Sequence, residues 1–351
     1  MIFRKKDKSE KKEKKEKKKR KIYKLTIFTL FLDLVIIVFL FVVYGPFPSF
    51  KNWWVTTALA TGNHKYFANV LYDQDTIIEV LKNNTVVENG EDTNTNEITF
   101  DDTVKDSYNS VYEEQILKRD EGNDIYKVVT IDEKDYSGYL VVIYDSSRVS
   151  LYTSSKIRSG GQHLTDMSKE SKALVAINAS GFGRRSGGLV PTGTVIKNGK
   201  ILSVGGTNRH GGGLIGFNKD GVLMLTASSA QTAIKNGMVE GMTFGPFLIV
   251  NGASAKVKGN GGWGYANRTA IAQRKDGIVL FLVIDGRGAN GSNGISIADM
   301  IKLLEKYEAY NAANLDGGGS SSLVVNGKLV NSPRGYGYTG ERYIPNSWIV
   351  K

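Results

Sequence analysis

Two aspartates that follow apolar, strand-like runs are the residues of this chain best placed to do chemistry. Asp285 follows the run 278–284, and Asp316 follows the run 311–315. Three glycines and three serines, residues 317–322, come directly after Asp316. A carboxylate beside bare backbone N–H groups suits acid–base or nucleophilic work next to an anion. We therefore predict that Asp285 and Asp316 are catalytic, in the manner of two-carboxylate glycosyl transfer.

Other polar residues at strand ends are candidates for binding a substrate. Arginine can hold phosphate or carboxylate through two hydrogen bonds, and glycine lets an anion approach the backbone closely. The predicted substrate-binding residues are Asn178, Arg268, Arg287, Gly317, Gly318, Gly319, Ser320, Arg342 and Asn346. The alternative is structural, because an Asp-Gly pair after a strand commonly forms a turn. Arg342 and Asn346 could likewise serve only to hold the last strand.

The composition removes several kinds of site. The chain has 351 residues with no cysteine and three histidines, which excludes thiol catalysis, disulfides and cysteine zinc sites. A histidine-rich zinc site is not expected either. We predict no metal-ligating residues and no cofactor, and we do not exclude a divalent metal.

The net charge of +11 is concentrated at one end. Residues 1–24 hold 14 basic and 4 acidic residues, a net of +10, which leaves 32 basic and 31 acidic residues in the other 327. Because the rest of the chain is nearly neutral, no nucleic-acid partner is expected.

An apolar run at residues 25–44 predicts a single transmembrane helix. Its twenty residues span about 30 Å as a helix, the thickness of a bilayer core. The alternative is a signal peptide, but the run is too long for one and no small-residue cleavage site follows it. The basic tail 1–24 should stay cytoplasmic, which places residues 45–351 outside. The predicted location is the cell membrane, single-pass, with the C-terminal domain extracellular.

The segments next to the expected span have their own predictions. Asp33 is a lone carboxylate in the expected span. It could contact a membrane partner, or it could be a tolerated side chain that is protonated and has no such role. Residues 45–81 predict a juxtamembrane helical segment, and their Trp53 and Trp54 fit an interfacial belt. Residues 82–125 are rich in Asn, Asp, Glu and Thr, and predict a polar, hydrated spacer.

Residues 126–351 predict a sheet-dominated, glycine-rich α+β domain. Of the 40 glycines, 35 lie in residues 139–351, between apolar runs of strand length. Asx-Gly pairs at 198–199, 220–221, 276–277 and 326–327 suit hairpin turns, so antiparallel pairing is expected. One helix is predicted after Ser296, where apolar residues follow a helical spacing and Asp299 is a capping-box partner.

Six strings of this domain carry a family resemblance. They are INASGF (177–182), FGPFLIVNG (244–252), NRTAIAQRKDG (267–277), VIDGR (283–287), NAANLDGGGSSS (311–322) and ERYIPNSW (341–348). Together they resemble the phosphodiester glycosidase domain, the family of N-acetylglucosamine-1-phosphodiester alpha-N-acetylglucosaminidase and of bacterial exopolysaccharide biosynthesis-type proteins. The resemblance covers residues 126–351 and implies hydrolysis of a sugar-1-phosphodiester. One departure is that Ala179 and Ser180 stand where glycines are usual.

The functional hypothesis is a membrane-anchored, extracytoplasmic glycosidase that hydrolyses sugar-1-phosphodiester linkages in cell-envelope polysaccharide. Its expected partners are a phosphate-linked glycan as substrate and the lipid bilayer. One alternative is a non-catalytic module that binds glycan phosphate and scaffolds an envelope polysaccharide assembly complex. The other is the same site used for transfer instead of hydrolysis.

Overall fold

The chain divides into two compact units. The computed structural model describes residues 3–60, 66–101, 107–157, 160–185, 188–204, 212–335 and 337–351. The first unit is Met1–Val80 and the second is Leu81–Lys351.

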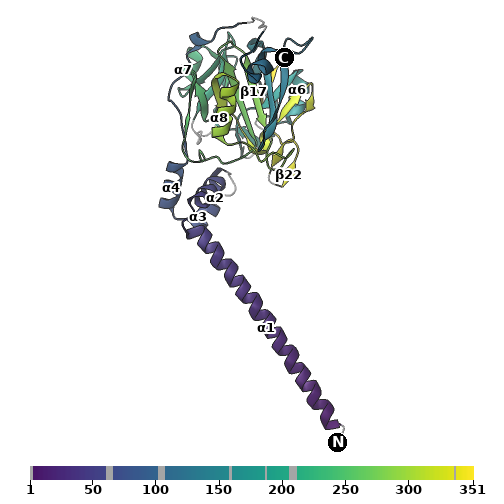
Figure 1. Ribbon diagram of the computed structural model, residues 1–351. Coiled ribbons are helices and arrows are strands. Elements are labelled where there is room, and N and C mark those ends of the chain that lie inside the picture. The colour runs from purple at the N-terminus through teal and green to yellow at the C-terminus, as the bar shows by residue number, and fades with distance from the viewer. Residues whose placement is uncertain are drawn as a thin grey trace. The chain divides into compact units, whose positions relative to one another are not determined.

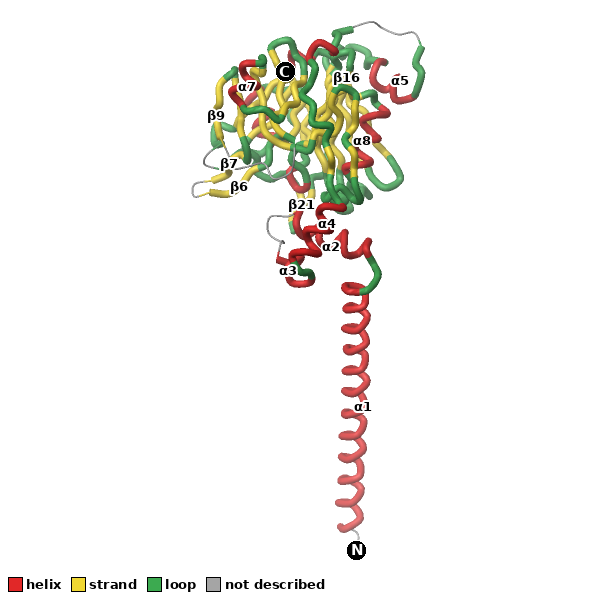
Figure 2. Tube along the Cα trace, turned by 90° about the vertical axis from the view of Figure 1, so that its left-hand side faces the viewer, coloured by secondary structure: helices red, strands yellow, loops and turns green. Residues whose placement is uncertain are grey.

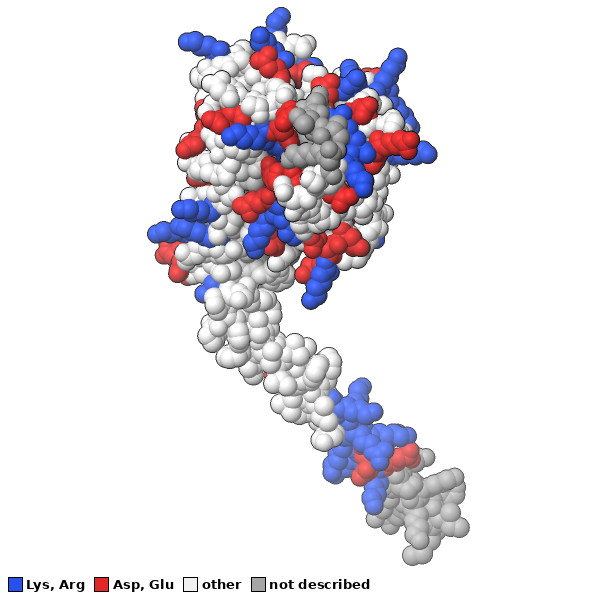
Figure 3. Space-filling view, turned by 45° about the horizontal axis from the view of Figure 1, so that its top comes forward, with Lys and Arg blue, Asp and Glu red and all other residues white. Residues whose placement is uncertain are grey.

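The first unit begins with one long helix, α1 (Phe3–Tyr44). Its segment from Lys12 to Tyr44 is long and apolar enough to cross a membrane, a test of length and composition that a signal sequence would also pass. Figure 3 shows the Lys-rich part of α1 as a blue block followed by a segment without charges on that face. The helix extends back through the basic tail because Lys and Glu are good helix formers, and Glu13 pairs with Lys17 at 2.7 Å.

Three shorter helices complete the first unit: α2 (Pro48–Ala60), α3 (Tyr66–Leu71) and α4 (Gln74–Asn83), whose last residues extend into the second. Their shared core is small and includes a residue from the end of α1. Its buried members are Val43, Val55, Ala58, Ala68, Tyr72, Ile77 and Val80. Within residues 45–81, where a helical segment is expected, the described helices are α2, α3 and most of α4.

The second unit is built on three antiparallel sheets in the described part of the chain. A seven-stranded sheet has the order β14 (Ala253–Ser254), β13 (Phe247–Val250), β18 (Ala309–Asn314), β16 (Arg268–Arg274), β17 (Val279–Ile284), β3 (Ser137–Ile143), β2 (Tyr126–Asp132). A five-stranded sheet has the order β11 (Leu223–Thr226), β10 (Gly213–Asn218), β12 (Met238–Phe244), β8 (Thr194–Lys197), β9 (Lys200–Val204). Another has the order β20 (Lys328–Leu329), β19 (Leu323–Val325), β5 (Val175–Asn178), β23 (Asn346–Val350), β4 (Val149–Thr153).

Short pairs and helices surround these sheets. The strand pairs are β1 (Val86–Val87) with β15 (Lys256–Val257), β6 (Phe182–Arg185) with β7 (Gly188–Pro191), and β21 (Arg334–Gly335) with β22 (Tyr338–Thr339). The helices are α5 (Val111–Leu117), α6 (Leu164–Ser171), α7 (Ala230–Lys235) and α8 (Ile297–Lys306), with 3-10 turns η1 (Thr95–Glu97), η2 (Ser146–Arg148) and η3 (Gly318–Ser320).

Two hydrophobic cores lie on opposite faces of the seven-stranded sheet. Alternate residues of β17 point to each: Phe281 joins the core shared with the five-stranded sheets, whereas Leu282 joins the core under α8. Figure 1 shows α8 lying on this sheet, and Figure 2 shows α5 and α8 on the side of β16 away from β9. Every residue of β17 is buried, which explains its continuous apolar sequence.

The α+β, sheet-dominated class predicted from sequence is confirmed. The predicted helix is α8, capped by the Ser296 hydroxyl, which accepts the Asp299 N–H at 3.1 Å. Asn198-Gly199 and Asn326-Gly327 both have two consecutive positive φ angles, as a type I′ hairpin requires. The pairs at 220–221 and 276–277 have positive φ only at the glycine, so their turns differ.

The region 82–125 differs from the expected hydrated spacer. Its strand β1 pairs with β15, and Thr93 N–H donates to Leu225 O at 3.0 Å. Asn89 donates through Nδ2 to Val250 O at 3.1 Å. Asn89 thus uses its polar side chain to bind a strand end, and the described residues 86–93 lie against strands of the second unit.

Candidate active site

The two aspartates lie at one edge of the seven-stranded sheet. In the register of β16 with its neighbours, Arg268 is opposite Ile284 of β17 and Ala270 is opposite Asn314 of β18. Asp285 and Asp316 therefore leave the sheet on either side of β16. Because neighbouring strands are about 4.8 Å apart, their backbones are separated by roughly 10 Å.

The glycine-rich turn after Asp316 is held at both ends by the backbone. Asp316 N–H donates to Ala179 O at 3.0 Å, and Gly318 N–H donates to Asn267 O at 2.9 Å. Gly318 has a φ of 60°, which favours glycine, and a Cβ at Gly319 would clash with the Tyr338 hydroxyl oxygen. The glycines are thus needed for the turn and for the close approach of Tyr338.

Asp316 has an unusual electrostatic environment. Burial raises the pKa of its carboxyl to about 6, against smaller lowering effects from the Ser320 hydroxyl, the Arg342 guanidinium and the Gly317 N–H. The Ser320 hydroxyl lies near the carboxylate, yet it has no hydrogen bond of good geometry in the described part of the chain. A carboxyl with a pKa near 6 can exchange a proton at neutral pH.

Arg268 is a buried cation without a carboxylate partner among the described residues. It is 3% exposed, and its Nη2 donates to the carbonyl oxygens of Trp263 and Gly264, each at 2.9 Å. Burial, with a smaller effect from the Arg287 charge, lowers the pKa of its guanidinium to about 10. It is therefore still charged at neutral pH, and its buried Nε has no protein partner among the described residues.

Arg287 lies on the other side of the glycine-rich turn. A Cβ on Gly318 would be 3.3 Å from its Nη2, and its Nη1 donates to Arg334 O at 2.7 Å. Its backbone φ is 54°, a left-handed conformation that costs a non-glycine residue of the order of 1–3 kcal/mol. Such strain is common at functional sites, and it points the Arg287 side chain at the turn.

Arg342 is brought to the site by a short segment next to α6. Its guanidinium lies over the Phe182 ring at 4.5 Å. The preceding residue, Glu341, accepts hydrogen bonds from Thr165 N–H at 2.9 Å and from the Thr165 hydroxyl at 2.7 Å. The Tyr343 ring contacts the His163 ring, with centroids 4.3 Å apart and the ring planes tilted by 52°. Residues 341–343 are thus tied to the first turn of α6 on both sides of Arg342.

Asp285 is fully buried and its carboxylate is already occupied by donors. It accepts Asn331 Nδ2 and Asn290 Nδ2, each at 2.9 Å, and Ser332 N–H at 3.1 Å. These contacts join the turn that carries Arg287 to the segment that leads to Arg334. The structure therefore places Asp285 at the same edge as Asp316 but holds the two carboxyls in very different surroundings.

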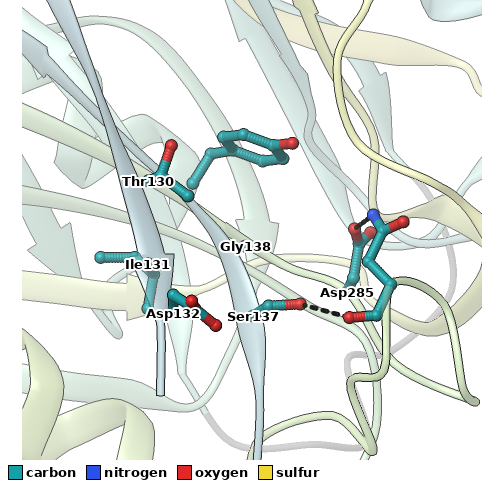
Figure 4. Close-up of a pocket in the computed structure, with 8 residues that line it drawn as sticks. Thr130, Ile131, Asp132, Ser137, Gly138 and Asp285 are labelled. Atoms are coloured by element: carbon teal, nitrogen blue, oxygen red, sulfur yellow. Dashed lines mark hydrogen bonds between the residues drawn. The ribbon is translucent and has the colours of Figure 1, made fainter.

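A hollow of about 220 Å³ lies beside Asp285, between the ends of β2 and β3. It is lined by Thr130, Ile131, Asp132, Ser137, Gly138, Tyr139, Asp285 and Asn290. Figure 4 shows Thr130, Ile131 and Asp132 on one side and Asp285 on the other, and the Ser137 hydroxyl between them donates to Asn290 O. Burial, and to a smaller extent the Asp285 charge, raises the pKa of Tyr139.

The two predicted asparagines are buried and connect backbone segments. Asn178 donates to Asp316 O at 2.6 Å and accepts from the Thr269 hydroxyl at 2.8 Å. Asn346 accepts from the N–H and hydroxyl of Ser180, at 3.0 and 2.7 Å. Ser180, one of the departures from the family strings, therefore uses its hydroxyl to bind the last strand.

Several residues of the site were not predicted from the sequence. Tyr338 contacts the turn through Gly319, and Asn331 holds Asp285. The signal that could have found Tyr338 is an aromatic residue in the glycine-rich stretch 335–340. Nothing in the local sequence marks Asn331, because its partner lies 46 residues away.

Buried polar atoms without a protein partner gather around the turn. In the described residues they include both side-chain atoms of Asn267, Nε of Arg268 and the hydroxyls of Ser320 and Ser321. Buried polar groups are normally satisfied, so such a cluster is typical of a polar binding site. No group of three or more His, Cys, Asp or Glu residues in the described ranges could hold a metal ion.

Comparison with known proteins gives the family. The sequence model of the family described as phosphodiester glycosidase matches residues 171–351, just over half of the chain. An uncharacterised prophage-derived protein, YomE of Bacillus subtilis, is 33% identical over 174 residues, 47% of this chain and 26% of its own length. The N-acetylglucosamine-1-phosphodiester alpha-N-acetylglucosaminidase of Bos taurus is 28% identical over 185 residues, 48% of this chain and 34% of its own. The chain thus spans about a quarter to a third of these relatives.

A solved structure shares the fold. The zebrafish N-acetylglucosamine-1-phosphodiester alpha-N-acetylglucosaminidase catalytic domain, auto-inhibited by its pro-peptide, superposes with a TM-score of 0.53 at 22% identity. The similarity covers 66% of this chain and 85% of the zebrafish one. The family predicted from the six sequence strings is confirmed over residues 171–351, and this chain belongs to the phosphodiester glycosidase family.

Proposed function

We propose that this protein is a glycosidase that hydrolyses a sugar-1-phosphodiester, with Asp316 as its reacting carboxyl. The observation that carries this proposal is a half-buried aspartate, whose pKa burial raises to about 6, on a glycine-rich turn beside Arg268 and Arg287. Membership of the family supports the reaction class.

The arginines suit the phosphate half of the substrate. The charge of Arg287 is a secondary cause of the lowered pKa of Arg268, and Arg268 has no carboxylate partner in the described residues. An anion between two such cations relieves this repulsion and gains charge-assisted hydrogen bonds. The orphaned polar atoms of Asn267, Ser320 and Ser321 offer further partners for phosphate and sugar oxygens.

Asp316 suits the sugar half in its ionised form. In the proposed reaction the oxygen of water joins the anomeric carbon, the bond from that carbon to the bridging oxygen breaks, and a phosphate monoester leaves. One proton of the water stays on the new anomeric hydroxyl, and the other goes to the phosphate monoester or to solvent. A phosphate monoester leaves without full protonation, because its second pKa is about 6. A carboxylate with a pKa near 6 is well matched to act as base or nucleophile at neutral pH.

The remaining predicted residues hold this arrangement in place. We propose that Asp285 is a positioning residue for Arg287, because its carboxylate is saturated by Asn290, Asn331 and Ser332. Asn178 and Asn346 act in the same way on the Asp316 turn and on Ser180. Arg342 is proposed to contact the anionic product beside Asp316.

We further propose that the substrate is a phosphate-linked polysaccharide of the cell envelope. The support is an apolar helix, long enough to cross a membrane, that follows a basic segment. Because basic flanks tend to stay cytoplasmic, we propose that the N-terminus is cytoplasmic and the second unit lies outside. A protease added to intact cells should then remove the second unit. Protection of that unit would contradict the orientation without affecting the proposed chemistry.

The experiment for the activity uses the full chain in detergent, because residues 84–101 pack on the sheets and a chain starting at 126 would lose them. The protein is given a synthetic sugar-1-phosphodiester, and released sugar is measured. We expect turnover by the native chain and loss of most of it in Asp316→Asn. Binding without turnover would instead support the non-catalytic glycan-phosphate module, and full activity in Asp316→Asn would refute the role of Asp316.

A further inference from the structure

Aromatic side chains gather in the first unit where the apolar helix ends. Residues Phe47, Phe50, Trp53, Trp54, Tyr66 and Phe67 form a cluster on α2, α3 and the turn before them, here called the aromatic collar. Each ring contacts the next one in the cluster. The ring centroids are 5.9 Å apart for Phe50 and Trp54, 6.4 Å for Trp54 and Phe67, and 4.1 Å for Tyr66 and Phe67.

The aromatic collar is fixed directly to α1. Val43, in the last turn of α1, is 1% exposed in the core of α2–α4, and its carbonyl accepts the Tyr72 hydroxyl at 3.0 Å. Gly45 N–H closes the helix on Phe41 O at 2.8 Å, and α2 begins three residues later. The Phe47 ring packs on Phe41 at 5.4 Å. The collar therefore begins at the end of the apolar run, without a linker.

Much of the aromatic collar faces outward. Trp53 is 52% exposed and Tyr66 is 57% exposed, and Val70, one turn after Tyr66 on α3, is 69% exposed. In a water-soluble protein, contiguous exposed rings of this kind mark a contact surface. Trp and Tyr combine an apolar ring with a polar N–H or O–H, so they suit a boundary between an apolar phase and water.

The charges around the aromatic collar fit the same boundary. Between Gly45 and Tyr72 the sequence contains two lysines, Lys51 and Lys65, and no Arg, Asp or Glu. This stretch therefore has no side-chain carboxylate. Acidic residues return at Asp73 and Asp75, at the start of α4. A segment with aromatic residues and a few lysines suits anionic lipid headgroups.

We propose that the aromatic collar lies in the headgroup region of the bilayer that α1 spans, so that α2 and α3 rest on the membrane and the chain leaves it at Asp73. The occupant of this surface is lipid. The apolar part of α1 fixes the depth, because its twenty residues match about 30 Å of hydrocarbon and place Val43 and the attached helices at the boundary. This inference does not depend on the activity of the second unit.

The absence of cysteine allows a direct test on the full chain in lipid vesicles. Val70→Cys is labelled with a nitroxide, and Lys219→Cys, in the turn between β10 and β11, is the water-exposed control. We expect the ratio of oxygen to nickel-chelate collisions to be roughly threefold or more higher at position 70, because oxygen concentrates in the apolar phase and the chelate stays in water.

Native tryptophan fluorescence gives a second measurement that needs no label. Lipids brominated near the headgroup should quench the wild-type emission, and Trp53→Phe should remove a large part of the quenched component. Equal collision ratios at positions 70 and 219, or no quenching by shallow brominated lipids, would overturn the proposal. Spin–spin broadening of the nitroxide at position 70, together with low access to both oxygen and the nickel chelate, would also overturn the proposal. A second copy of the chain would then cover the aromatic collar.

Discussion

Replacing Asp316 by Asn should stabilise the fold at neutral pH while removing activity. The pKa of the Asp316 carboxyl is raised from 3.8 to about 6, so the folded state favours the protonated form. A raised pKa contributes stability that is fully present below the unfolded pKa and is lost as the pH rises through the folded one. A shift of about two pKa units corresponds to roughly 3 kcal/mol lost by the native chain between about pH 4 and pH 7.

The variant does not incur this loss, because its amide is neutral at every pH. At pH 8 we expect Asp316→Asn to be more stable by roughly 3 kcal/mol, about 5 °C in Tm for a unit of this size. Near pH 4 the two proteins should unfold together. Thermal unfolding of the full chain in detergent, followed by circular dichroism at both pH values, measures this difference.

Asp220→Asn is a matched control, because Asp220 is exposed in the turn between β10 and β11. Its Tm should change by about a degree or less, as surface substitutions usually do. A loss of stability in Asp316→Asn at pH 8, or a difference that does not change with pH, would refute the electrostatic description of the site.

Other predictions follow from the same contacts. The kcat/KM of the native chain should rise about tenfold per pH unit up to about pH 6 and then level off, and a profile that falls through pH 6 would assign Asp316 as an acid instead. Asp285→Asn should destabilise the second unit by about 1–3 kcal/mol, because an amide nitrogen would face the donors of Asn331 or Asn290; stability equal to the native chain would contradict the buried network. Gly319→Ala should lower activity at least tenfold by displacing Tyr338, and Tyr338→Ala should restore part of it in the double variant; no loss in Gly319→Ala would contradict the close contact.

The class of fold and the edge of the sheet could be predicted from the sequence. The apolar runs before Asp285 and Asp316 became β17 and β18, and because β16 lies between them both aspartates reach one edge. The Asn198-Gly199 pair predicted a hairpin because two consecutive positive φ angles suit these residue types. These predictions rest on local patterns that tertiary packing preserved.

The surroundings of the two carboxyls could not be predicted from local sequence. Asp285 and Asp316 both precede glycine, yet one is saturated by Asn331 and Ser332 and the other is desolvated beside Ser320. The partners of Asp285 come from a segment 46 residues away, so no local pattern reveals them. The left-handed backbone of Arg287 is equally hidden, because arginine rarely adopts it.

The hydrogen-bond partners of residues 82–125 could not be predicted from local sequence either. Their polar composition is typical of a hydrated segment, and the sequence gives no register for single hydrogen bonds to distant strand ends. Asn89 and Thr93 bind Val250 and Leu225, more than 130 residues further along the chain. Composition therefore described the solvent-facing side of this segment and missed the side that lies on the sheets.

The central claim is that the bond broken lies between the sugar and oxygen, and labelled water tests it most directly. The full chain is incubated with a sugar-1-phosphodiester in water enriched in oxygen-18, and any phosphate monoester released is examined by phosphorus NMR or mass spectrometry. We expect the monoester to contain no label, because water attacks the anomeric carbon beside Asp316 and the bridging oxygen leaves with phosphate. Label in the monoester would show attack at phosphorus and would contradict the account.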